Sequence, residues 1–86
     1  MLNWHVYVLR NSSKNFTYVG LTGNLERRIA EHNNGTVQST KAYLPLEVEA
    51  IVSVRTERKA HELERYFKTG SGRAILKKRI LNYADA

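Results

Sequence analysis

Two short runs of aromatic and β-branched residues near the start of the chain predict a β-hairpin. Residues 4–10 read Trp-His-Val-Tyr-Val-Leu-Arg, and residues 16–19 read Phe-Thr-Tyr-Val. The polar cluster Asn-Ser-Ser-Lys-Asn at 11–15 is typical of the turn that joins two such strands. The hairpin restricts the fold to one built around an antiparallel sheet.

The position of the turn decides which side chains of the hairpin face one another. If the loop is centred between Ser12 and Ser13, Tyr7 lies directly opposite Tyr18. The two phenols then project from the same face of the sheet, with Cβ atoms about 5 Å apart. This spacing is compatible either with a pair of functional phenols or with an aromatic pair that stabilises the sheet.

The rest of the chain predicts one more strand and three helices. Leu46, Val48, Ala50, Val52 and Val54 point one way, while Glu47, Glu49 and Ser53 point the other, which indicates a strand over 46–54 with one buried face. Helical periodicity runs from about Asn24 to His32, capped by Thr22 or Asn24, and from after its cap Thr56 to before Gly70. A third helix is expected from the cap candidate Ser71 to about Asn82, and residues 35–45 are expected to form a polar loop. We therefore expect an α+β fold of order β-β-α-β-α-α, with a small, mainly antiparallel three-stranded sheet flanked by helices.

Length and composition limit the kinds of protein that remain possible. The 86 residues fit a single domain, which we expect to span 1–86. No apolar run approaches the roughly 18 residues of a membrane-spanning helix, and the N-terminus does not resemble a secretory signal. The absence of cysteine excludes disulfides and thiol catalysis and is compatible with the cytoplasm, where we expect the protein.

The positive charge is concentrated in one part of the sequence. The formal net charge is +6, and residues 55–80 hold nine Lys and Arg against three Glu, whereas the remaining residues balance. An excess of this kind favours a polyanionic partner such as nucleic acid, or an anionic membrane surface. Of these we expect nucleic acid, most simply DNA, and no membrane. We expect the backbone of the nucleic acid to be contacted by five residues: Lys41, Arg73, Lys77, Lys78 and Arg79.

In the first predicted helix, Arg28 and His32 share a face with the apolar residues Leu25 and Ile29. A guanidinium at the edge of an apolar stripe suits a phosphate ligand, because its planar fork matches two phosphate oxygens. Arg28 can equally lay its stem along the core and leave its head in solvent. His32 can equally be a half-buried histidine with satisfied hydrogen bonds.

In the second predicted helix, Glu64 lies at the border of the apolar stripe formed by Ala60, Leu63 and Phe67. A carboxylate there needs a cation, a hydrogen-bond donor or a metal ion, because desolvating it alone is costly. Lys68, one helical turn further on, can supply an ion pair instead. Since no dense acidic cluster is present, a metal site would have few protein ligands and keep several waters, as Mg²⁺ tolerates.

Taken together, these residues resemble the GIY-YIG nuclease family, in its short stand-alone bacterial form. The resemblance rests on His5-Val6-Tyr7, on Tyr18-Val19-Gly20 eleven positions later, and on Arg28, His32 and Glu64 in the same order. It covers the chain from Trp4 to about Leu81. The family also includes the cutting domains of homing endonucleases and excision-repair nucleases.

The resemblance implies a catalytic role for five residues. Tyr7 and Tyr18 resemble the two motif tyrosines, one of which helps to deprotonate the attacking water. Arg28 resembles the arginine that stabilises charge on the scissile phosphate, and His32 resembles an auxiliary histidine. Glu64 resembles the glutamate that binds the single divalent metal ion, Mg²⁺ or Mn²⁺.

The function implied is a metal-dependent endonuclease that hydrolyses phosphodiester bonds in DNA and serves DNA repair or processing. A chain this short has no room for a separate target-reading domain, so we expect low sequence specificity, with strand structure or single-strandedness as the feature recognised. A protein partner could supply targeting. The alternative is a basic nucleic-acid-binding module with the same fold and no catalysis.

Overall fold

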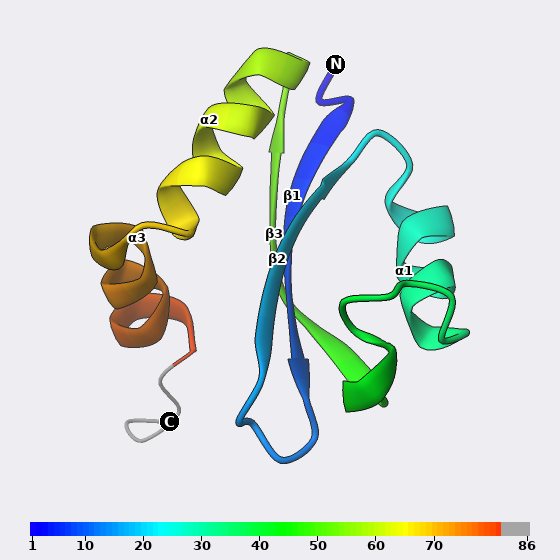
Figure 1. The fold of residues 1–86 in the computed structure, drawn as a ribbon. Helices are drawn as coiled ribbons and strands as arrows, with labels where there is room; N and C mark the ends of the chain where they lie inside the picture. Colours follow the sequence, from blue (N-terminus) through cyan, green and yellow to red (C-terminus); the bar gives the residue numbers. More distant parts are fainter. Residues whose placement is uncertain (82–86) are drawn as a thin grey trace.

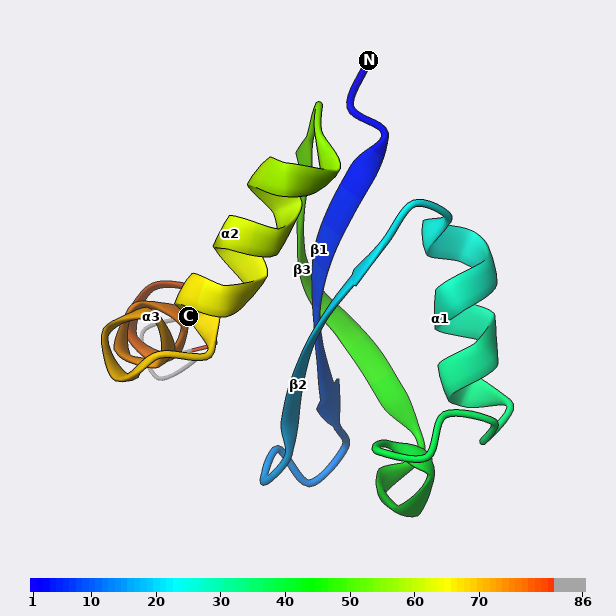
Figure 2. The same cartoon turned by 45° about the horizontal axis from the view of Figure 1, so that its top comes forward.

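The computed structural model describes residues 1–81 and confirms the predicted fold class and element order. A three-stranded antiparallel sheet, with strand order β2-β1-β3, lies between helices on its two faces (Figures 1 and 2). The strands are β1 (Trp4–Asn11), β2 (Thr17–Thr22) and β3 (Leu46–Val54). The helices are α1 (Leu25–Asn33), η1 (Lys41–Tyr43), α2 (Glu57–Phe67), α3 (Gly70–Ile75) and η2 (Leu76–Ile80).

The β1–β2 hairpin forms as expected, but the predicted register is wrong by two residues. Tyr7 lies opposite Gly20, and Tyr18 lies opposite Leu9. Because the displacement is even, both tyrosines still project from the same face of the sheet. They are diagonal neighbours with ring centroids 6.2 Å apart.

The turn explains the different register. The side-chain Oδ1 of Asn11 accepts hydrogen bonds from the backbone N–H groups of Asn15 and Phe16, at 3.2 and 3.1 Å. Lys14 adopts a left-handed conformation with φ of 60°. The loop is therefore centred between Ser13 and Lys14, one position later than the sequence suggested.

Strand β3 has its predicted bounds, but its apolar residues do not share one face. The register with β1 shifts where Val8 pairs with Ala50 and Leu9 with Val48, which leaves Glu49 as an extra residue. An extra residue of this kind reverses the side-chain alternation. Leu46 consequently packs with Tyr7 and Leu9, whereas Ala50 packs on the opposite face.

Two apolar clusters therefore hold the sheet between its helices. One contains Val6, Val8, Val19, Ala60, Phe67 and Leu76, and joins the sheet to α2 and η2. The other contains Tyr7, Leu9 and Leu46, with Leu25 and Ile29 of α1 packed against it. The first motif tyrosine is thus part of the core on the α1 face.

The helices begin at side-chain caps, as the sequence indicated for two of the three. Asn24 caps α1 by accepting from Arg27 N, and Thr56 caps α2 by accepting from Lys59 N. The cap of α3 is Thr69, which accepts from Gly72 N, so the prediction of Ser71 is wrong. Gly72 is needed there because a Cβ would collide with the carbonyl oxygen of Tyr66.

The third predicted helix is divided into α3 and the π-helical segment η2, in which the N–H of Leu81 donates to the carbonyl of Leu76 at 2.8 Å. Its predicted end at Asn82 lies outside the described residues.

The segment 35–45, expected to be a polar loop, contains the short helix η1 and two buried residues, Val37 and Thr40. Within residues 1–81, no helix is long and apolar enough to cross a bilayer.

Candidate active site

Tyr7 lies in the middle of the central strand, and its ring extends over the neighbouring strand at Gly20. Only 1% of Tyr7 is exposed. A Cβ at Gly20 would collide with the Cζ and Oη atoms of Tyr7 and would lie 2.8 Å from a ring carbon of Tyr18. The glycine of the second motif is therefore required because the hydroxyl end of Tyr7 occupies the space of a side chain.

The Tyr7 hydroxyl is hydrogen-bonded to a histidine on α1. Its oxygen lies 2.8 Å from Nε2 of His32, and the other ring nitrogen, Nδ1, lies 2.8 Å from Oγ1 of Thr40. His32 and Thr40 are both fully buried. The Tyr18 ring meets the edge of the His32 ring at a centroid distance of 5.1 Å. The two motif tyrosines and His32 therefore form one contiguous cluster.

The pKa shifts follow from this burial and from two charges nearby. Burial lowers the pKa of His32, and the Arg28 charge lowers it further, so His32 is neutral near pH 7. Burial also raises the pKa of Tyr7, and the Glu64 charge adds to this rise, whereas interaction with Arg28 opposes it. The charges of Arg28 on α1 and Glu64 on α2 therefore both act on the Tyr7 phenol.

Arg28 keeps a position between the core and solvent, as its place on the helix predicted. Its side chain is 35% exposed, and Nη1 donates to Glu31 at 2.9 Å. This ion pair raises the pKa of Arg28 and lowers that of Glu31. The guanidinium is therefore a permanent cation next to Tyr7, and Glu31 holds it there.

Glu64 is half-buried on α2, with 24% of its side chain exposed. It forms an ion pair with Lys68 at 3.5 Å, so the alternative considered from the sequence is present in the structure. Among residues 1–81, no three His, Cys, Asp or Glu side chains group together around a possible metal position. A single accessible carboxylate fits Mg²⁺, which takes oxygen ligands and keeps water and substrate oxygens in its coordination sphere. It does not fit zinc, which takes three or four protein ligands.

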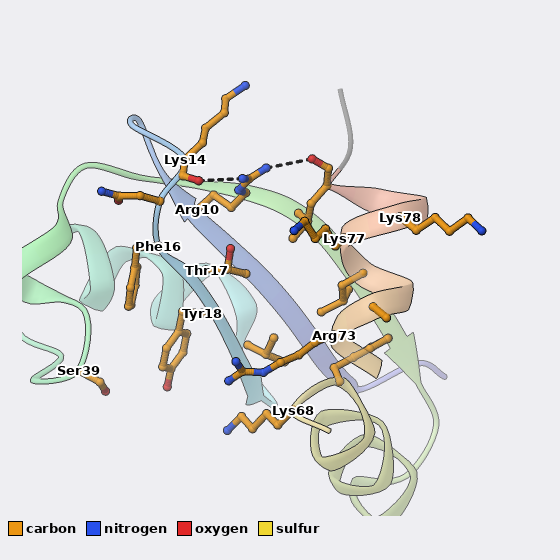
Figure 3. Close-up of a pocket in the computed structure, with 16 residues that line it drawn as sticks. Arg10, Lys14, Phe16, Thr17, Tyr18, Ser39, Lys68, Arg73, Lys77 and Lys78 are labelled. Atoms are coloured by element: carbon orange, nitrogen blue, oxygen red, sulfur yellow. Dashed lines mark hydrogen bonds between the residues drawn. The ribbon is translucent and has the colours of Figure 1, made fainter. Parts of the chain in front are cut away.

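An open groove of about 1130 Å³ adjoins the site along the free edge of β2 (Figure 3). Tyr18 lines this groove, whereas Tyr7, Arg28, His32 and Glu64 do not. Tyr18 is thus the residue of the tyrosine–histidine cluster that the groove reaches.

The predicted nucleic-acid-binding residues divide into two groups. Arg73 of α3 and Lys77 and Lys78 of η2 line the groove. Arg79 is exposed on the same segment, and Lys41 is exposed at the start of η1, but neither lines the groove. The structure therefore brings three of the five predicted cations to the groove that Tyr18 also lines.

Sequence reasoning missed two residues of the site. Helical periodicity places Glu31 on the face of α1 away from Leu25 and Ile29, so it suggested no role in the site, yet its three-residue spacing from Arg28 permits the ion pair that forms. Thr40 had no detectable signal, because it lies within the predicted loop at 35–45 and reaches His32 only through the fold. Lys68 was considered solely as a partner for Glu64, and it also lines the groove.

Comparison with known proteins identifies the family of the chain. The family model for the GIY-YIG catalytic domain matches residues 3–79. A UPF0213 protein of Bacillus licheniformis is 33% identical over 67 residues, which cover 77% of this chain and 69% of the relative. The UPF0213 protein YazA of Bacillus subtilis is 34% identical over 67 residues, covering 77% of this chain and 68% of the relative. No solved structure matches the chain significantly.

The match covers both motif tyrosines, Arg28, His32 and Glu64, and extends over every described helix and strand except the last residue of η2. The chain therefore belongs to the GIY-YIG family of nucleases.

Proposed function

We propose that the protein is an endonuclease that hydrolyses phosphodiester bonds in DNA with the help of a divalent metal ion. The observation that carries this proposal is the convergence of Arg28 and Glu64 on the tyrosine–histidine cluster. One of these groups is a permanent cation suited to a phosphate, and the other is an accessible carboxylate suited to Mg²⁺ or Mn²⁺. A protein that only bound nucleic acid would not require this pair.

We assign different tasks to the two tyrosines because their surroundings differ. Tyr7 is buried and its raised pKa keeps the phenol protonated, so it serves to orient the site through His32. Tyr18 lines the groove and can contact a substrate or an attacking water directly. Its hydroxyl is therefore the better candidate for guiding the proton that leaves the attacking water.

Arg28 and Glu64 act on the phosphate. The Arg28 guanidinium, fixed by Glu31, faces the negative charge that grows on the phosphate oxygens in the transition state. Glu64 would hold the metal ion, exchanging its ion pair with Lys68 for a metal–oxygen bond. When bound, the ion supplies Lewis-acid stabilisation of charge on the phosphoryl oxygens.

The Lys and Arg residues that line the groove suit contacts with the phosphate backbone, which carries no sequence information. This supports low sequence specificity, with strand structure as the feature recognised, and a role in DNA repair or processing. The cytoplasm is the compartment we propose, and a partner protein for targeting would be compatible with the exposed surface. The organisation of 1–86 as a single domain stays a prediction.

The test is a cleavage panel with purified protein and labelled single-stranded, duplex, flap and branched DNA, together with an RNA strand. We expect Mg²⁺- or Mn²⁺-dependent cleavage of at least one DNA substrate, abolished by Glu64→Ala and strongly reduced by Arg28→Ala. Salt-sensitive binding without cleavage of any substrate would favour the alternative, a non-catalytic binding module.

A further inference from the structure

The groove beside β2 runs away from the candidate active site in one direction only. Figure 3 shows Tyr18 and Lys68 at one end, with Lys14 and Lys77 toward the tip of the hairpin at the other. Three consecutive residues of β2, Thr17, Tyr18 and Val19, line the groove between these ends. Its floor is thus the free edge of the sheet, which no other strand pairs with among the described residues.

The groove is strongly electropositive. Six of its lining residues are Lys or Arg and none is Asp or Glu. Among residues 1–81, Arg73, Lys77 and Lys78 form no ion pair with a carboxylate. A surface of this kind attracts a polyanion along its whole length.

Arg10 adds a charge at the hairpin end and joins the two walls of the groove. Its guanidinium donates to the carbonyl of Leu81 at 3.0 Å and to the carbonyl of Lys14 at 2.9 Å (Figure 3). Its Nε is buried and has no hydrogen-bond partner among the described residues. Its partners are neutral carbonyls, and no carboxylate of residues 1–81 forms an ion pair with Arg10.

Arg28, His32 and Glu64 do not line the groove. Another, smaller pocket is separate from it, and there Arg58 and Lys59 pair with Glu62. Those two cations are therefore already engaged, whereas Arg73, Lys77 and Lys78 of the groove pair with no carboxylate of residues 1–81.

We propose that the groove grips the phosphodiester backbone on one side only of the bond that is cut. The strand on that side passes over β2 toward the hairpin, where Lys77, Lys78 and Arg10 contact successive phosphates. The strand on the other side leaves the site without an equivalent grip. This proposal rests on the proposed nuclease function, and it adds that the strand is bound more tightly on one side of the cleaved bond than on the other.

The experiment uses oligothymidylate that is longer than the groove. It is tested both as a single strand and annealed to oligoadenylate, and it is labelled at its 5′ end in one sample and at its 3′ end in another. Mapping every product by length shows how near to each end the protein can cut. We expect cleavage to continue up to one end of the strand and to stop several linkages short of the other, because the gripped side must be occupied. Stopping at equal distances from both ends would overturn the proposal while leaving the nuclease function intact.

A pair of double variants links the asymmetry to the groove. Lys77→Gln with Lys78→Gln should make the distances at which cleavage stops from the two ends more nearly equal. It should also reduce the steepness with which log affinity falls against log salt by about 1.4 to 1.8. Arg55→Gln with Arg58→Gln removes the same charge away from the groove and should keep the asymmetric product profile. If the Lys77 and Lys78 variant kept the same difference between the two ends of the strand, the proposal would also be overturned. A complete lack of cleavage by the wild-type protein would instead overturn the proposed function on which it rests.

Discussion

The Tyr7 hydroxyl lies 2.8 Å from Nε2 of His32, and neither residue is accessible to solvent beyond 1%. This bond joins the central strand of the sheet to α1. It leaves Tyr18, rather than Tyr7, as the phenol that the groove reaches. The two motif tyrosines therefore differ in what their hydroxyls contribute.

We predict that Tyr7→Phe and Tyr18→Phe affect stability differently. Tyr7→Phe leaves a buried nitrogen of His32 without a partner, which should lower the free energy of unfolding by about 1–3 kcal/mol. Tyr18→Phe should lower it less, because Tyr18 borders the groove, and should still slow cleavage. Urea denaturation of both variants tests this, and a larger loss of stability for Tyr18→Phe would contradict the assignment.

Thr40 should matter through its hydroxyl. Thr40→Val keeps the shape but removes the partner of His32 Nδ1, so we expect about 1–3 kcal/mol of lost stability and slower cleavage. Thr40→Ser keeps the hydroxyl and should restore most of both. If the serine variant were as impaired as the valine variant, packing of the methyl group rather than the hydrogen bond would explain the effect.

The lowered pKa of His32 predicts a pH dependence of stability. The unfolded chain binds a proton at His32 near its ordinary pKa of about 6.5, while the folded protein keeps the ring neutral to lower pH. The stabilisation from burying neutral His32 is fully present above that pH and is lost as the pH falls below it. Thermal unfolding between neutral and mildly acidic pH should show this loss.

A histidine exchange elsewhere provides the comparison for this pH effect. His32→Gln should flatten the dependence of the melting temperature on pH, whereas His61→Gln, at an exposed position on α2, should leave it nearly unchanged. An equal slope in wild type and His32→Gln would show that other groups cause the acid sensitivity.

Gly20→Ala should disturb the site sterically. The new methyl group would meet the hydroxyl end of Tyr7, so we expect a loss of about 1–3 kcal/mol in stability and a loss of cleavage. Gly70→Ala is the matched control, because no atom lies within 4 Å of a Cβ there. A Gly20→Ala protein with wild-type activity would contradict the placement of Tyr7.

Local patterns predicted most of the fold. The strand over 46–54 and the caps Asn24 and Thr56 were found from the sequence, because alternation and capping depend on near neighbours. The hairpin register was not, since it depends on Asn11 accepting two backbone hydrogen bonds in the turn. The apolar side chains of β3 lie on both faces of the sheet because of a bulge at Glu49, and no residue type in this segment predicts a bulge.

The candidate site shows the same division. The positions of Arg28 and Glu64 at the borders of apolar stripes could be worked out from helical geometry. The contact between His32 and Thr40 could not, because it joins α1 to a segment whose path is set by the whole fold. The groove was also beyond reach, since it is formed by the β2 edge together with α3 and η2.

The most direct test of the central claim is the initial rate of cleavage of one labelled DNA strand in Mg²⁺, measured for wild type, Glu64→Ala and Glu62→Ala. Glu62 lies two residues away on α2 and pairs with Lys59, so its removal is a matched control. We predict cleavage by wild type and Glu62→Ala that EDTA abolishes, and a loss of at least about 100-fold for Glu64→Ala, the scale of losing an electrostatic catalytic group. Equal rates for wild type and Glu64→Ala would contradict the claim that this site cuts nucleic acid.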